Sequence, residues 1–252
     1  MIFNIGTAPI RKLPVLDASY PQDVSASEVG ASATFKVIIA EDGKPSEYSY
    51  QWYYDETAVS GATKSNYTLN IAYGSHSVYC IVTNKAGSVK SRTATLAGTK
   101  LYLYKSGDEC KSISGGWNLA SNNGNIQMSL SKGSSYMTLS STWTNNYTSH
   151  ACCSAVNKVD VSQYAKLNVQ YDYSYTISTM SGAGECYSTL NFGLGTSRTS
   201  VSSASVSASK GTSKTVSVDI SALKTSLYVV ANSRNYGNNG TINIKIRNVW
   251  LS

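Results

Sequence analysis

Apolar and polar residues alternate along much of this chain, and a two-residue period is the pattern of a half-buried β-strand. Apolar side chains occupy every second position in residues 33–39, 48–54, 67–71 and 78–82. No window has the Glu, Lys, Leu and Ala content of a long amphipathic helix. The pattern therefore predicts an all-β protein.

The alternation divides the chain into an arm and two domains. In residues 1–20 apolar residues recur without helical spacing, and Pro9 and Pro14 lie among them, so we expect an extended arm. The arm either packs on its own domain or docks into a partner subunit, and docking is favoured because exposed apolar segments usually mark contact surfaces. Residues 21–98 predict about seven short strands, and a short join at 98–100 leads to a second domain at 99–252.

The second domain also reads as strands alone, and two of its turns repeat one signal. Residues 158–162 and 216–221 both end in Asp-(Val/Ile)-Ser, whose side chains can hydrogen-bond their own backbone and set a turn. The alternating pattern predicts strands at 101–105, 125–130, 135–140, 151–158, 166–176, 187–194, 213–218, 226–232 and 241–250.

The first domain resembles the bacterial immunoglobulin-like (Ig-like) modules of the immunoglobulin superfamily. Trp52 matches the core Trp of strand C, Cys80 matches the second Cys on strand F, and YCIVTNKAG matches the F–G hairpin. The first Cys of the family would fall near Val37, so the resemblance implies a sandwich without its disulfide. Such domains mostly display or bind other molecules.

The second domain resembles jelly-roll β-sandwiches of the carbohydrate-binding or galactose-binding kind. The resemblance rests on the Val-Asp-(Val/Ile)-Ser segments and on the closing strand TINIKIRNVWLS. We therefore expect an N-terminal Ig-like β-sandwich followed by a C-terminal jelly-roll-type β-sandwich. An arm, an Ig-like module and a terminal sandwich together resemble tail-associated or decorating proteins of bacteriophages. That resemblance implies a virion protein, made in the host cytoplasm, whose arm binds other virion structural proteins.

Charge is unevenly distributed along the chain. Residues 1–99 hold eight basic and eight acidic residues, so the net charge of +7 comes from residues 100–252. This excess suits an anionic partner such as an acidic cell-wall polymer, a sulfated glycan or nucleic acid, or else consists of scattered solubilising lysines. Nucleic acid is not expected, because Asn243, Lys245 and Arg247 lack interleaved aromatic residues. A signal peptide and an apolar stretch of roughly 20 residues are both missing, so no membrane association is expected.

The sequence offers little catalytic or metal-binding chemistry. Its two histidines, His76 and His150, fall in different domains, and no nucleophile motif accompanies either. We expect no catalytic residue, no metal and no cofactor. A small cell-wall glycan hydrolase stays open as an alternative if Glu185 lies near a second carboxylate. Buried free thiols are favoured over a disulfide or a metal site for the five cysteines, which are Cys80, Cys110, Cys152, Cys153 and Cys186.

Two loops combine the aromatic rings and amides that sugar recognition requires. They are residues 142–147 and 232–239, and the alternative is that their aromatic residues belong to the core, as we expect for Trp117 and Trp250. We predict non-enzymatic adhesion to a bacterial surface glycan, with a purely structural particle protein as the alternative. Virion attachment uses many weak sites, so a homo-oligomer is expected. The candidate ligand-binding residues are Trp143, Asn145, Asn146, Tyr147, Arg234, Asn235 and Tyr236.

Overall fold

A computed structural model of the protein describes residues 12–40, 47–106, 116–122, 126–144, 148–178, 187–236 and 239–252. Every named element within these ranges is a β-strand, which confirms the predicted all-β class. The chain forms two compact units, Met1–Thr99 and Lys100–Ser252.

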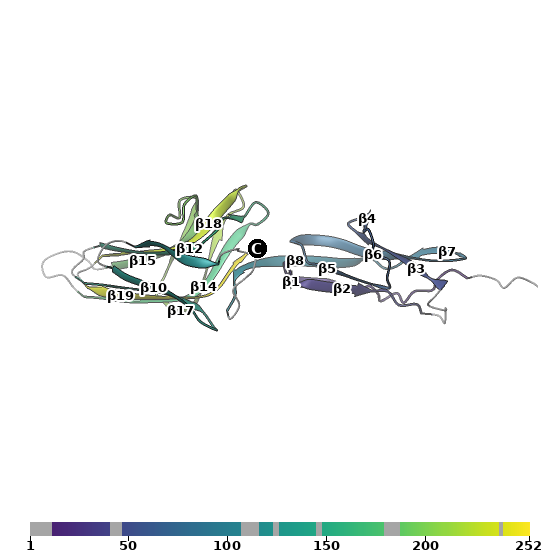
Figure 1. Cartoon of the computed structure of the whole chain (residues 1–252), viewed down its shortest axis with the longest axis horizontal. Coiled ribbons are helices and arrows are strands. Elements are labelled where there is room, and N and C mark those ends of the chain that lie inside the picture. Colours follow the sequence, from purple (N-terminus) through teal and green to yellow (C-terminus); the bar gives the residue numbers. More distant parts are fainter. Residues whose placement is uncertain are drawn as a thin grey trace, which may run out of the picture. The chain divides into compact units, whose positions relative to one another are not determined.

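The first unit is a sandwich of two small sheets (Figure 1). In one sheet, β2 pairs with β5. In the other, the order is β4-β3-β6-β8, with β7 also on β6 and β1 on β8. The strands are β1 (Val24–Glu28), β2 (Ser32–Lys36), β3 (Ser49–Tyr54), β4 (Thr57–Ala58), β5 (Asn66–Asn70), β6 (Gly74–Asn84), β7 (Gly87–Lys90) and β8 (Ala94–Tyr104).

The core of this unit forms around the two residues that carried the Ig-like resemblance. Trp52 on β3 pairs with Cys80 on β6, and both are fully buried. The Trp52 Nε1 donates a 2.8 Å hydrogen bond to the carbonyl oxygen of Lys64, which satisfies the indole N–H. Cys80 is a free thiol, as the missing first Cys implied. The Ig-like expectation is thereby confirmed.

The described part of the arm packs against its own domain. Leu16 forms a β-bridge with Ile39, and the Asn84 Nδ2 donates a 2.8 Å hydrogen bond to the carbonyl oxygen of Lys12. Leu13 and Val15 stay 52% and 40% exposed. Residues 12–20 therefore follow the first of the two expectations for the arm, and residues 1–11 lie outside the described residues.

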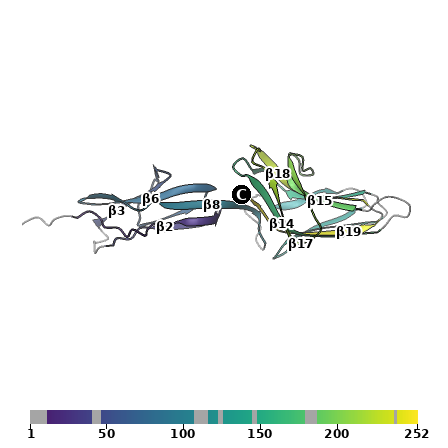
Figure 2. The ribbon, with the colours of Figure 1, turned by 180° about the vertical axis from the view of Figure 1, so that it is seen from behind.

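The second unit is a sandwich of two larger sheets, seen as two layers in Figure 1 and from behind in Figure 2. One sheet has the order β10-β11-β19-β14-β17, with the end of β8 also on β19. The other has the order β16-β15-β18-β12-β9, with β13 on β18. The strands are β9 (Trp117–Asn122), β10 (Ile126–Lys132), β11 (Met137–Trp143), β12 (Thr148–Ala155), β13 (Val159–Asp160), β14 (Lys166–Ile177), β15 (Tyr187–Gly195), β16 (Ala204–Ala208), β17 (Gly211–Asp219), β18 (Ser226–Tyr236) and β19 (Gly240–Leu251).

The core of the second unit lies between these two sheets. The rings of Tyr171 on β14 and Phe192 on β15 approach to 5.0 Å across the sandwich. Trp117 is 4% exposed and belongs to the core, as expected. Trp250 does not: it is half-buried, and its ring lies 6.1 Å from the ring of Tyr102.

The two Asp-(Val/Ile)-Ser segments form the turns that the sequence predicted. Asp160 accepts a 2.9 Å hydrogen bond from the backbone N–H of Ser162, and Asp219 accepts one of equal length from Ser221. The bond from the Ser162 N–H holds the pKa of Asp160 below its usual value, and bonds from the Ser221 hydroxyl and N–H do the same for Asp219. In each case the turn ends a strand and leads toward the next.

Candidate functional site

Four of the seven candidate ligand-binding residues from the sequence lie within the described residues, and they differ in solvent exposure. Trp143 is 1% exposed and Asn235 is fully buried, so neither offers the ligand-contacting surface that was expected of it. Arg234 is exposed and Tyr236 is half-buried, both on β18. The remaining three, Asn145, Asn146 and Tyr147, lie outside the described residues.

Trp143 is buried because a glycine faces it on the neighbouring strand. In the β11·β19 ladder Trp143 pairs with Gly240. A Cβ atom on Gly240 would lie 2.3 Å from Cζ2 of Trp143, so the indole occupies the space that a side chain would fill. The ring is thus a packing element of the sandwich, which is the alternative that the sequence left open.

Asn235 is buried because it belongs to a chain of hydrogen bonds inside the sandwich. Its Oδ1 accepts from Ser188 and, at 3.1 Å, from Ser233. Because the Ser188 proton is used in that bond, the Tyr173 hydroxyl must be the donor in its contact with Ser188. Tyr173 is on β14, so the chain links the two sheets directly behind Tyr187, Arg234 and Tyr236.

The outward face of the β16-β15-β18-β12-β9 sheet carries the exposed aromatic residues. Tyr187 on β15 pairs with Tyr236 on β18, and the rings stack with centroids 5.6 Å apart and an interplanar angle of 17°. Tyr187 is 46% exposed. Two aromatic rings at one end of an exposed sheet offer an apolar platform beside polar groups.

Polar side chains continue this face along the same two strands. Arg234 pairs with Thr189 and Asn232 pairs with Asn191, one and two rows from the tyrosine pair. The Asn191 Oδ1 accepts a 2.9 Å hydrogen bond from Ser207, which fixes its amide. We refer to the outward positions of β15, β16 and β18, from the tyrosine pair to the Asn191–Asn232 row, as the polar–aromatic face.

A loop of residues 196–203 closes the far end of the polar–aromatic face. The Arg198 Nε donates a 3.0 Å hydrogen bond to Oγ of Ser154, and the Cys152 Sγ lies 3.4 Å from the carbonyl oxygen of Arg198. Ser154 and Val230 lie on the outward face of the sheet but are fully buried, as expected if this loop covers them. At Gly195, a Cβ atom would lie 1.7 Å from the carbonyl oxygen of Ser200, so glycine permits the close approach.

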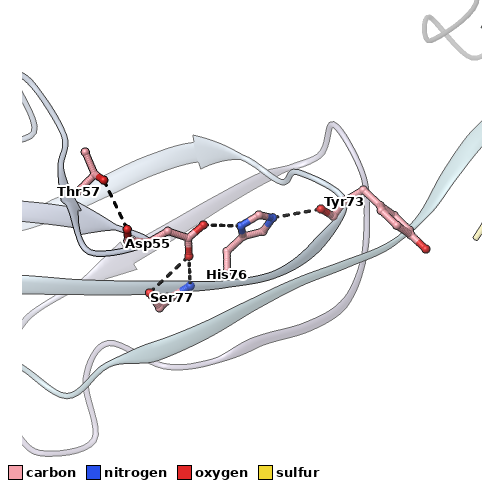
Figure 3. A network of polar contacts seen from close by, with 5 residues as sticks. All are labelled: Asp55, Thr57, Tyr73, His76 and Ser77. Carbon is pink, nitrogen blue, oxygen red and sulfur yellow. Dashed lines mark hydrogen bonds and ion pairs between the residues drawn. The ribbon is translucent and has the colours of Figure 1, made fainter. Parts of the chain in front are cut away.

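A His–Asp pair in the first unit could suggest catalysis (Figure 3). The His76 Nδ1 lies 2.7 Å from the Asp55 carboxylate, which also accepts a 2.8 Å bond from the backbone N–H of Ser77. The His76 Nε2, however, faces the carbonyl oxygen of Tyr73 at 3.1 Å, where a nucleophile would have to lie. Burial raises the pKa of Asp55, but the bonds from Ser77 and His76 outweigh it and the pKa lies below its usual value. The pair therefore fixes the turn between β3 and β4.

Buried thiols and the remaining ligand types give no second site within the described residues. Cys80, Cys152 and Cys153 are buried and free, as expected, while Cys110 and Cys186 lie outside the described residues. No group of three or more His, Cys, Asp or Glu that could hold a metal occurs in the part of the chain that the structure describes. Nor do the described residues include a helix of the length and apolar character that a membrane span requires.

Sequence reasoning found two residues of the polar–aromatic face, Arg234 and Tyr236, and missed Tyr187, Thr189 and Asn191. The missed residues occupy alternate positions of one predicted strand, on the face that points away from the buried Leu190 and Phe192. Their Tyr-x-Thr-x-Asn alternation was the available signal. These residues belong to the candidate site only because β15 pairs with β18, and the sequence did not specify that pairing.

Comparison with known proteins finds similar solved structures at low sequence identity. No protein-family model and no curated protein matches the chain. A solved carbohydrate-binding module of the β-sandwich superfamily is 16% identical over 97% of this chain and 100% of that chain, with a TM-score of 0.39. A family 11 carbohydrate-binding module from Clostridium thermocellum, in complex with a mixed-linked tetrasaccharide, is 13% identical over 60% of this chain and 94% of that chain, with a TM-score of 0.34. The mixed-linkage glucan protein SGBP-B of Bacteroides ovatus, in complex with a heptasaccharide, is 8% identical over 96% of this chain and 100% of that chain, with a TM-score of 0.29.

Proposed function

We propose that the second domain is a non-catalytic glycan-binding module whose ligand lies on the polar–aromatic face. The observation that carries this proposal is the stacked pair of exposed Tyr187 and half-buried Tyr236, at the end of a sheet face lined by Thr189, Arg234 and Asn191. Sugar rings present C–H faces to aromatic rings and hydroxyls to amides and side-chain hydroxyls. The face offers both kinds of group on adjacent strands.

The rigidity of the face supports the same proposal. Asn191 is held by Ser207, and Thr189 donates a 3.1 Å hydrogen bond to the carbonyl oxygen of Arg234. Side chains fixed before the ligand arrives lose less conformational entropy on binding. A sheet face behind which a buried hydrogen-bond chain links both layers is a suitable support for a shallow glycan site.

The phage resemblance of the sequence supplies the biological setting of this proposal. In that setting the Ig-like domain and the arm attach to a virion, and the second domain contacts a glycan of the host surface as one copy of a homo-oligomer. A purely structural particle protein is the second candidate, and one observation favours it: Trp143, the aromatic residue first expected to bind sugar, is buried.

Binding of the full chain to a panel of purified glycans tests the proposal, with Tyr187→Ala and Tyr236→Ala as variants. We expect each variant to raise the dissociation constant for the bound glycan roughly tenfold, because each removes a ring contact of about 1 kcal/mol or more. Affinity electrophoresis followed by calorimetry measures this change.

Tyr102→Ala is the matched control, since Tyr102 is a half-buried tyrosine that packs on Trp250 near the other sheet. We expect this variant to bind as the unmodified chain does. Binding that survives both Tyr187→Ala and Tyr236→Ala would mean that the glycan binds elsewhere on the chain. Absence of binding to every glycan of the panel would leave the structural alternative.

A further inference from the structure

Five of the six strands in the sheet that bears the polar–aromatic face contain no carboxylate. Neither Asp nor Glu occurs in β9, β12, β15, β16 or β18. Asp160 on β13 is the described carboxylate that pairs into this sheet, opposite Ser226. Ser226 lies eight residues from Arg234 along β18, or about 26 Å at the usual strand rise. Asp160 also accepts a hydrogen bond from the backbone N–H of Ser162.

The other described carboxylates of this domain are engaged elsewhere. Asp172 on β14 forms an ion pair with Arg247 at 2.6 Å in the opposite sheet, and Asp219 accepts two bonds from Ser221. The polar–aromatic face therefore carries positive charge without a described acidic neighbour. This arrangement accounts for part of the basic excess that the sequence shows in residues 100–252.

One guanidinium group on this face is open to a ligand. Arg234 is exposed and has no ion pair among the residues that the structure describes. Arg198, at the far end of the face, uses Nε on Ser154, and its Nη2 is buried, so that atom is not accessible to a ligand. An oxyanion is the partner that a guanidinium binds most strongly, often with two parallel bonds.

We infer that the polar–aromatic face selects an anionic polysaccharide, whose sugars carry carboxylate or sulfate groups that Arg234 contacts while Tyr187 and Tyr236 stack on a sugar ring. This inference rests on the proposed glycan-binding function. From Tyr236 to Asn232 the face extends over four residues of β18, a separation of about 13 Å along the strand. One monosaccharide does not span that length, so the ligand is an oligomer or polymer.

Binding of the full chain to four probes tests the inference: polygalacturonate with carboxylates, dextran sulfate with sulfates, neutral mixed-linkage β-glucan, and single-stranded poly(dT). We expect one of the two anionic polysaccharides to bind at least tenfold more tightly than the neutral glucan. Its dissociation constant should rise with added salt, because salt screens exposed charges. The first two probes distinguish carboxylate from sulfate recognition.

The variant Arg234→Gln assigns the effect to a residue. We expect it to weaken binding of the anionic polysaccharide about tenfold, as the loss of a charge-assisted contact does. Binding of the neutral glucan, where it is measurable, should not change. Lys214→Gln on β17 removes the same charge from an exposed position of the opposite sheet and should have no effect.

The outcomes separate the two proposals. Equal binding of neutral and anionic glycans, unchanged in Arg234→Gln but lost in Tyr187→Ala, would overturn the charge selection and keep the glycan site. Binding of a polysaccharide that ignores both tyrosine variants would overturn the site itself and the inference with it. Tighter binding of poly(dT) than of either anionic polysaccharide would assign the face to nucleic acid and overturn both.

Discussion

At the scale of single residues, Asp172 shows how one carboxylate stabilises an irregular stretch of sheet. It accepts bonds from Arg247 at 2.6 and 3.3 Å and from the backbone N–H of Ser213 at 2.7 Å. Ser213 has a φ of 51°, in the left-handed region that is unfavourable for a residue with a side chain. The register of β14 against β17 also shifts between Tyr171 and Tyr173. The carboxylate therefore fixes a strained turn beside a bulge.

Replacing Asp172 by Asn should lower the stability of the second domain in a pH-dependent way. Arg247 and the Ser213 N–H hold the pKa of Asp172 below its usual value, despite some burial. A lowered pKa in the folded state contributes stability above the unfolded value of about 3.9, and this contribution is lost as the pH falls through the folded value. We expect Asp172→Asn to lose about 1–3 kcal/mol near neutral pH and little at low pH.

Urea unfolding at about pH 7 and about pH 3 measures this difference. Asn243→Ala, an exposed change on the neighbouring strand, serves as the control. A loss of equal size at both pH values would mean that packing rather than charge explains the effect of Asp172→Asn.

At the scale of elements, the ladder at the ends of β11, β19 and β14 depends on one glycine. Gly240 pairs with Trp143 on one side and with Ile177 on the other. A Cβ atom on Gly240 would lie 2.3 Å from the indole and 2.9 Å from the carbonyl oxygen of Thr176. The bulky ring and the missing side chain thus form one complementary unit across two strands.

Gly240→Ala should destabilise the second domain by about 1–3 kcal/mol, because an added methyl group in a packed interior forces neighbours to move. Trp143→Phe should itself cost stability, yet it should reduce the penalty of Gly240→Ala in the double variant, since the two positions are in contact. A double-mutant cycle from thermal or urea unfolding measures the coupling. Strictly additive losses would contradict the contact.

The strands that the sequence failed to predict lie where the pattern carries least contrast. All nine strands predicted for residues 101–252 occur, and most of them alternate apolar and polar residues. β9 (WNLASN) and β16 (ASVSA) were missed, and both are the outermost strands of their sheet. An edge strand is covered on fewer sides, so small residues such as Ser and Ala suffice there.

The site was partly predictable for a related reason. Arg234 and Tyr236 could be found from local composition, since an Arg and Asn-rich stretch with an aromatic residue suits sugar binding. The partner of Tyr236 could not, because Tyr187 comes from a strand distant in sequence and only the register brings the rings together. Trp143 was misjudged because its burial depends on Gly240, almost a hundred residues later.

At the scale of the whole molecule, each unit has thiols that water does not reach. Cys80 lies in the core of the first unit, and Cys152 and Cys153 lie in the second. Burial raises the pKa of Cys80 and of Cys152 to about 12, and it raises the pKa of Cys153 further. A thiol that is both buried and protonated reacts slowly, since the thiolate is the nucleophile.

These three cysteines should therefore report the unfolding of each domain in the intact chain. In a Cys110→Ser/Cys186→Ser variant we expect slow alkylation under native conditions and fast alkylation once a domain unfolds. Mass spectrometry of the peptide that contains Cys80, and of the peptide that contains Cys152 and Cys153, assigns the reaction to a domain at each urea concentration. Rapid native labelling of any of the three would contradict their burial.

The strand β8 gives the molecule a mechanical property. Its residues Ala94–Gly98 pair with β6 in the first unit, and its residues from Leu101 onward pair with β19 in the second. Between these two ladders the chain has only Thr99 and Lys100, so it contains almost no slack. A force applied to the β8 backbone at this join therefore reaches the hydrogen bonds of both ladders without first extending a linker.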